Sequence, residues 1–134
     1  MDILETKLKS RIAEALPVGL IITDKDVNIL FVNEEFEKIT GWTLEEVRGK
    51  NPRILSSGKM TDQYYERLWA TVLSGGTWHE RIVNKKKDGS IYYALQKITN
   101  IKEKDETIGF IAVQEDITED ILREEKYKKN VDLY

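Results

Sequence analysis

The chain has 134 residues, 40% of them hydrophobic and 34% charged, which favours one compact domain. Its 24 acidic and 21 basic residues are mixed along the length, so we expect no broad basic face and no nucleic-acid partner. The absence of cysteine excludes disulfides, thiolate metal sites and cysteinyl adducts to a cofactor within this chain. No apolar run approaches the roughly 20 residues needed to span a bilayer, and the chain does not begin with a signal-peptide pattern. We therefore expect a cytoplasmic location without direct membrane contact.

The first predicted element is a helix over residues 1–16. Apolar residues recur at helical spacing from Ile3 through Leu8 and Ile12, among charged neighbours. The pattern is typical of an amphipathic helix, and Pro17 ends it.

Two short strands and several short helical turns follow. Residues 19–23 and 28–33 are rich in β-branched and apolar side chains, and the Asp-rich turn between them predicts a hairpin. Asn33 is placed to cap a helix over residues 34–40, and Thr43 is placed to cap a further turn. Residues 49–58 are dense in Gly, Ser and Pro, which indicates a loop or helical turn.

The second half predicts one long helix, three strands and an exit helix. An apolar stripe from Tyr64 to Leu73, capped by Thr61 or Asp62, favours a helix that packs on a sheet. Residues 77–86, 90–101 and 107–117 are rich in β-formers and predict an antiparallel meander. Beyond Thr118 a thin apolar seam among charged residues indicates a helix that leaves the core. The order predicts an α+β fold.

Five short motifs in this order resemble a known family. They are Asn33-Glu34-Glu35-Phe36, Thr40-Gly41-Trp42, Gly49-Lys50-Asn51-Pro52-Arg53, Lys87-Asp88-Gly89-Ser90 and Asp116-Ile117-Thr118. From about residue 15 to residue 118 the chain resembles PAS (Per-Arnt-Sim) domains of bacterial sensor kinases, cyclases and regulators. The resemblance implies a five-stranded antiparallel sheet of order 2-1-5-4-3, with short helices enclosing a pocket. It also implies three segments: a helix at 1–16, a PAS domain at 17–118 and a linker or output helix at 119–134.

The resemblance suggests roles for residues near the end of the last strand. In the family the Asp-x-Thr triplet lies where this strand meets the output helix, which assigns Asp116 and Thr118 to signal relay. Gln114 falls where the flavin-binding light-oxygen-voltage branch carries the glutamine that passes on the signal. The alternative is that Asp116 and Thr118 only end a strand and cap a helix.

A cofactor is the next implication of the resemblance. The light-oxygen-voltage branch carries Asn-Cys-Arg where this chain has Asn51-Pro52-Arg53, so the cysteine that attacks the flavin is missing. Asn84 falls where that branch has an asparagine facing the flavin, whereas Ala94 replaces a second one. Amide side chains both donate and accept, as a flavin's pyrimidine edge requires, and Arg53 can pair with a phosphate.

Cysteine-less PAS redox sensors that bind FAD are the nearest ligand-bearing parallel. They share the Gly-Lys-Asn opening and a tryptophan near the start of the third strand, as Trp78 is here. The resemblance therefore implies FAD or FMN bound by Asn51, Arg53, Trp78, Asn84 and Gln114. The alternatives are another small molecule or no ligand, with these side chains solvated or in the core.

The sequence offers no sign of catalysis or of a metal site. Strand alternation puts His79 on the face opposite Trp78, so it is a poor haem ligand if Trp78 points inward. No nucleophile elbow, phosphate loop or metal motif organises the carboxylates and hydroxyls, so we expect no enzyme and no metal.

Two hypotheses for function remain. The first is a sensory domain of a multidomain signalling protein, homodimeric through its terminal helices, which relays a ligand signal to an effector domain. The second is a ligand-free dimerisation or spacer module whose pocket is filled by its own side chains. The candidates for that filling are Phe31, Phe36, Trp42, Ile54, Leu55 and Trp69.

Overall fold

The structure, a computed structural model, describes residue 3 and residues 17–132. The helix predicted at residues 1–16 therefore lies outside the described residues, apart from Ile3. In chain order the elements are β1 (Gly19–Asp24), β2 (Ile29–Val32), α2 (Glu34–Thr40), α3 (Leu44–Val47), η1 (Pro52–Leu55), α4 (Asp62–Leu73), β3 (Trp78–Lys85), β4 (Ile91–Glu103), β5 (Glu106–Asp116) and α5 (Thr118–Asp132).

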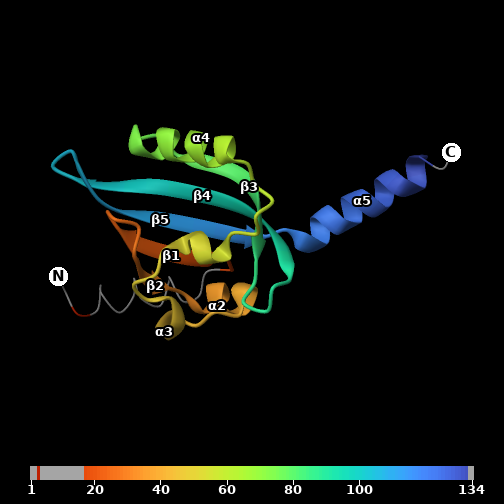
Figure 1. The fold of residues 1–134 in the computed structure, drawn as a ribbon, viewed down its shortest axis with the longest axis horizontal. Helices are drawn as coiled ribbons and strands as arrows, with labels where there is room; N and C mark the ends of the chain where they lie inside the picture. The colour runs from red at the N-terminus through yellow and green to blue at the C-terminus, as the bar shows by residue number, and fades with distance from the viewer. Residues whose placement is uncertain (1–2, 4–16, 133–134) are drawn as a thin grey trace.

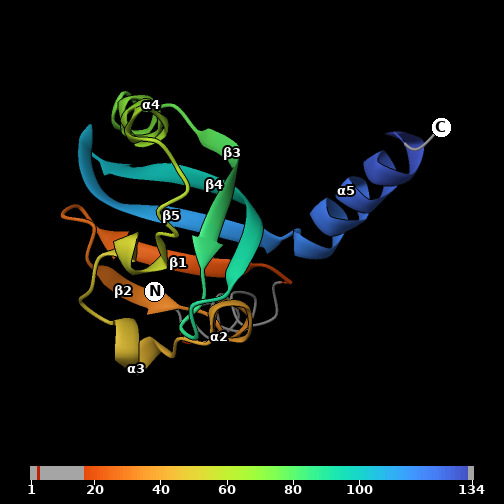
Figure 2. The same ribbon diagram turned by 45° about the vertical axis from the view of Figure 1, so that its right-hand side comes forward.

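The strands form one antiparallel sheet in the order β2-β1-β5-β4-β3, which confirms the predicted α+β fold and strand order. β1 and β5 pair in the middle although they are far apart in sequence. In both views α4 lies at the β3–β4 side of the sheet, and α2 and α3 lie at the β1–β2 side (Figures 1 and 2). This leaves the middle of the sheet facing the short helix η1.

The helices begin where the sequence provides caps. Asn33 Oδ1 accepts the N–H of Phe36 at the start of α2. Thr43 and Glu46 form a reciprocal capping box at α3, and the Thr61 hydroxyl accepts the N–H of Tyr64 at α4. The Gly-rich stretch after α3 contains a short 3₁₀ helix, η1, with Pro52 at its first turn.

Two hydrophobic clusters hold the helices on the sheet. In the first cluster α4 packs Tyr64, Leu68 and Val72 against sheet residues that include Ile82 and Ile98. In the second cluster the core is formed by Ile21, Ile29, Val32, Phe36, Val47 and Leu55. The space between these two clusters is where the candidate site lies.

The last helix, α5, leaves the domain (Figures 1 and 2). Only its start is anchored, because Ile117 and Ile121 are buried while Leu122 and Tyr127 are 52% and 71% exposed. A salt bridge of 3.6 Å joins Arg81 of β3 to Glu124, both exposed. Among the described helices none combines the length and apolar character needed to cross a membrane.

Candidate ligand pocket

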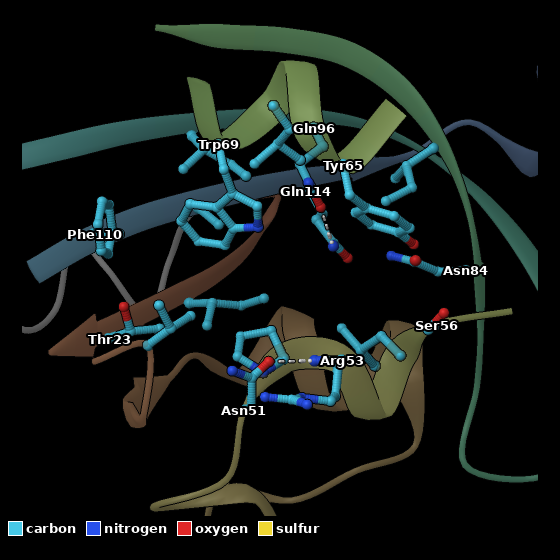
Figure 3. Close-up of a pocket in the computed structure, with 18 residues that line it drawn as sticks. Thr23, Asn51, Arg53, Ser56, Tyr65, Trp69, Asn84, Gln96, Phe110 and Gln114 are labelled. Atoms are coloured by element: carbon cyan, nitrogen blue, oxygen red, sulfur yellow. Dashed lines mark hydrogen bonds between the residues drawn. The ribbon is translucent and has the colours of Figure 1, made fainter. Parts of the chain in front are cut away.

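A cavity of about 470 Å³ lies between the two hydrophobic clusters, with residues of both in its walls. Volumes of this size are typical of sites for small organic ligands. Residues of β1, β3, β4 and β5 line one side, and residues of α4, η1 and the neighbouring loops complete the wall (Figure 3). The interior pocket that the resemblance implied is therefore present.

Three buried amides, Asn84, Gln96 and Gln114, line the sheet side of this cavity. They are 3%, 6% and 2% exposed. Strand register brings them together, because Gln96 of β4 is directly opposite Gln114 of β5, while Asn84 of β3 is opposite Tyr92 of β4. Of the three, Gln96 was not predicted from the sequence.

The amides belong to one continuous chain of hydrogen bonds through Tyr92. Asn84 Nδ2 donates to Tyr92 Oη at 3.3 Å, and Tyr92 Oη donates to Gln114 Oε1 at 2.7 Å. Gln114 Nε2 then donates to Gln96 Oε1 at 2.7 Å. This arrangement crosses three strands and links the three amides through a single phenol hydroxyl. Asn84 Oδ1 and Gln96 Nε2 have no hydrogen bond within the described chain and are available to a ligand.

Tyr92 is completely buried behind the cavity wall. Burial raises the pKa of its phenol far above the usual value, and the charge of Asp116 adds to the rise; the bonds with Asn84 and Gln114 oppose it. The hydroxyl therefore stays protonated at ordinary pH, so it can donate one hydrogen bond and accept another.

The opposite wall contains the predicted residues Asn51 and Arg53 (Figure 3). Asn51 has a structural role, since its Oδ1 accepts the N–H of Arg53 at 2.9 Å and caps η1. Arg53 is exposed and contributes to the lining, which places a cation at the rim. Ser56, just after η1, forms an isolated main-chain bridge with Asn84 that ties this wall to the sheet.

Trp78 is the one predicted ligand residue that does not line the cavity. It is 5% exposed and packs edge-on against Tyr64 in the α4 cluster, with its ring centroid 5.3 Å from that of Tyr64. Its position follows from the α4 side of the sheet, where Tyr64 and the Arg67 guanidinium, 5.5 Å from the ring centroid, both pack on the Trp78 ring. The interpretation of Trp78 as a core residue, not as a ligand contact, therefore fits its surroundings.

Of the side chains proposed to fill the pocket, only Leu55 and Trp69 reach the cavity wall. Phe36 is buried in the second cluster, and Trp42 and Ile54 pack against that cluster. Phe31 lies half-buried on β2 opposite Ile22. The cavity persists because these residues pack beside it.

The predicted relay residues meet at the end of β5. Asp116 Oδ1 accepts hydrogen bonds from the N–H and the hydroxyl of Thr118, at 3.0 and 2.6 Å. Thr118 also accepts the main-chain N–H of Tyr93, which directly follows Tyr92 on β4. The start of α5 is thus connected to β4 as well as to β5, a connection that sequence reasoning missed.

His79 points away from the core, as predicted, because Trp78 is buried and His79 is exposed. Within the described residues no group of three or more His, Cys, Asp or Glu is arranged to hold a metal ion.

Comparison with known families gives a match to the PAS fold over residues 7–117. The chain belongs to the PAS family. It is 28% identical over 121 residues to the nitrogen fixation regulatory protein of Klebsiella oxytoca, a match that covers 90% of this chain and 24% of the relative. It is 33% identical over 104 residues to a blue-light photoreceptor of Listeria monocytogenes, covering 75% of this chain and 41% of that protein.

Solved PAS structures have the same architecture. The light-oxygen-voltage domain of a blue-light activated histidine kinase from Erythrobacter litoralis superimposes with a TM-score of 0.70 at 29% identity, covering 77% of this chain and 98% of that domain. An RNA-binding light-oxygen-voltage receptor superimposes with a TM-score of 0.84, covering 96% of this chain and 38% of the receptor. At 21% identity, that receptor is evidence for the fold alone.

These relatives define the class of function. They include a regulatory protein, photoreceptors and a histidine kinase, so this PAS domain is a sensory module of signal transduction and is not itself catalytic. The chain spans about a quarter of the length of the Klebsiella relative. In the Klebsiella and Listeria relatives the matching region is therefore one part of a longer protein.

Proposed function

We propose that this PAS domain binds a flavin, FAD or FMN, in its cavity and senses the state of that flavin without a covalent bond to the protein. The observation that carries the proposal is the set of buried amides on the sheet wall, Asn84, Gln96 and Gln114. Without a ligand Asn84 Oδ1 and Gln96 Nε2 have no hydrogen-bond partner in the described chain, and buried polar groups cost stability unless they are satisfied.

The hydrogen-bonding groups of the wall suit a flavin. Asn84 Oδ1 can accept, and Gln96 Nε2 can donate, where they face the cavity. The pyrimidine edge of a flavin alternates carbonyl acceptors with an N–H donor, so it needs donors and an acceptor in one place. The apolar lining, which includes Ile21, Leu68 and Ile98, suits the flat ring system.

Arg53 and Asn51 form the second part of the proposed site. Arg53 is exposed at the rim, where its guanidinium can pair with a flavin phosphate that remains near solvent. Asn51 holds the first turn of η1 and so positions Arg53. We do not assign a ligand contact to Trp78, since it lies outside the lining.

The flavin would supply two-electron redox chemistry and blue-light absorption. The protein would orient the flavin and transmit the signal from the pocket to α5. Pro52 stands where an adduct-forming cysteine would be needed, and the chain has no cysteine at all. The signal is therefore a change of hydrogen bonding or charge in the pocket, which Gln114 passes along β5 to Asp116, Thr118 and α5.

The proposal extends to the parent protein. We infer a cytoplasmic signalling protein in which α5 leads to an effector domain. That domain is a kinase, a cyclase or a transcription regulator. The terminal helices of two copies pair in a homodimer. The exposed Leu122 and Tyr127 on α5 are apolar side chains that a second copy of this helix would cover.

The first experiment is the visible absorbance spectrum of the protein purified without added cofactor. We expect the near-ultraviolet and blue bands of an oxidised flavin, or their recovery after incubation with FAD or FMN. Gln96→Leu is expected to weaken flavin binding about tenfold, the loss of one or two buried hydrogen bonds. Gln63→Leu, on the exposed face of α4, is the matched control. A wild type that binds neither flavin overturns the proposal and favours a colourless ligand or the spacer module.

A further inference from the structure

The hydrogen-bonded chain Asn84–Tyr92–Gln114–Gln96, called here the amide relay, is built only from groups that can reverse their hydrogen bonds. Each of its members can both donate and accept a hydrogen bond. The same three contacts can therefore be made in two directions, one being the reverse of the other.

In the observed direction, donation runs from Asn84 through Tyr92 and Gln114 to Gln96. Rotating the three amides by a half turn and turning the phenol hydroxyl gives the reverse direction, from Gln96 to Asn84. Both arrangements make the same three contacts, so a ligand that binds one of them better shifts the relay toward that arrangement.

Reversal inverts what the cavity presents to a ligand. In the observed direction Gln96 offers an N–H and Asn84 offers a carbonyl oxygen. In the reversed direction Gln96 offers its oxygen and Asn84 an N–H. A ligand atom that accepts hydrogen bonds near Gln96 and Gln114 stabilises the first arrangement, and one that has gained a proton stabilises the second.

We propose that Tyr92 is the positioning residue that makes these amides reverse together, so that the protonation state of the ligand is converted into the polarity of the whole relay. Tyr92 does not line the cavity and is 0% exposed, so it senses a ligand only through its neighbours. The raised pKa of the phenol keeps its proton in place in both arrangements. The next residue, Tyr93, donates its main-chain N–H to Thr118 at the start of α5, which connects the relay to this helix.

This inference rests on the proposed flavin only for the identity of the ligand. The coupling among the amides is a property of the chain itself and is testable in the flavin-free protein. The decisive variant is Tyr92→Phe, which removes the hydroxyl and keeps the ring. Its control is Tyr93→Phe, the same change one residue later on the opposite face of β4.

The first measurement is the ¹H–¹⁵N spectrum of the side-chain amides of the flavin-free protein. We expect Tyr92→Phe to shift the signals of both Gln114 and Gln96, although Gln96 makes no hydrogen bond with Tyr92, and Tyr93→Phe to leave them in place. If Tyr92→Phe moves only its direct partners Asn84 and Gln114, the amides are not coupled and the inference is wrong.

The second measurement uses FAD-loaded protein and the ¹³C resonance of the Tyr92 ring carbon that bears the hydroxyl. We expect a shift when the flavin is reduced with dithionite, and the loss of that shift in Gln114→Leu, which cuts the relay at its centre. We also expect Tyr92→Phe to change the ratio of affinities for oxidised and reduced flavin about two- to tenfold, the range of one hydrogen bond. An unchanged ratio, or a Tyr92 resonance indifferent to reduction, overturns the inference.

The two proposals fail in different ways. A wild type that binds no flavin removes the proposed function, and the amide spectra of the free protein still decide whether Tyr92 couples Gln114 to Gln96. If Tyr92→Phe does not fold, Gln114→Leu provides the same decision. It breaks the relay between Tyr92 and Gln96, so the amide signals of Asn84 and Gln96 should no longer respond to each other.

Discussion

Thr118 Oγ1 accepts a hydrogen bond of 3.0 Å from the main-chain N–H of Tyr93, 25 residues earlier in the chain. The N–H of Ile117 donates to the Tyr93 carbonyl at 2.9 Å, so two bonds join the start of α5 to β4. Since β4 also carries Tyr92 and Gln96, the exit helix is attached to the strand that forms the middle of the polar pocket wall.

Replacing Thr118 by Val tests this attachment. The β-branched shape is kept, while the bonds of the hydroxyl to the Tyr93 N–H and to Asp116 are lost, which we expect to cost about 1 kcal/mol of local stability. Hydrogen exchange should become faster at the main-chain N–H groups of Tyr93 and Ile121. Thr118→Ser keeps the hydroxyl and should exchange as the wild type does. Equal exchange in Val and Ser variants would contradict the attachment.

Leu68 is the second test, because it belongs both to the α4 cluster and to the lining of the cavity. It is 3% exposed, so Leu68→Ala should lower the free energy of unfolding by about 2–5 kcal/mol, as large-to-small changes in cores do. Leu73→Ala, on the same helix at 59% exposure, should change it by less than about 0.5 kcal/mol. Urea unfolding of both variants measures the difference, and similar losses would argue against the packing of α4.

Asn33 connects β1 to α2 from a fully buried position. Its Oδ1 accepts the N–H groups of Leu20 and Phe36 at 2.9 and 3.0 Å, and its Nδ2 donates to the carbonyl of Val18 at 2.9 Å. Asn33→Ala should destabilise the domain by about 3 kcal/mol, because it leaves buried main-chain groups without partners.

The exposed cap Thr61 is the control for Asn33, since Thr61→Ala removes one capping bond to water-accessible groups. We expect a loss of about 1 kcal/mol from that variant. The Asn33 variant should therefore unfold at a clearly lower temperature than the Thr61 variant. If the Asn33 and Thr61 variants melted together, the buried network around Asn33 would contribute no more than an ordinary cap.

Glu46 gives a prediction about pH. Its contact with the Lys87 ammonium, followed by the N–H of Thr43, lowers the pKa of the carboxyl from 4.5 to about 2. A lowered pKa means that the stabilisation is present above pH 4.5 and is lost as the pH falls through about 2. Lys87→Met should move the NMR titration midpoint of Glu46 up toward 4.5, and Lys59→Met should not. A midpoint unchanged in the Lys87 variant would rule out this pair as the cause.

Local features of the fold were predictable because they depend on neighbours in sequence. The caps at Asn33, Thr43 and Thr61 are side chains that accept the main-chain N–H three residues further on. The Asp88-Gly89 turn likewise needs only the positive φ that Gly89 adopts, at 90°.

The polar wall was predicted only in part. Asn84 and Gln114 were predicted from the resemblance to a flavin-binding branch, whereas Gln96 was not, because that branch has its second amide at the position of Ala94. Alternation along β4 provides the signal that could have found it, since Tyr92, Ala94 and Gln96 share one face. Trp78 matches the flavin-binding relatives in sequence but lies outside the pocket, because it packs against Tyr64 of α4.

The sequence by itself determined the elements, the caps, the family and the absence of adduct chemistry, because these depend on local pattern and on which residue types are present. Only the tertiary structure decided that Tyr92 connects Asn84 to Gln114, that Gln96 completes the wall, and that Thr118 is held by β4. These contacts depend on the register between β3, β4 and β5, which is set by pairing across many residues and not by any short stretch of the chain.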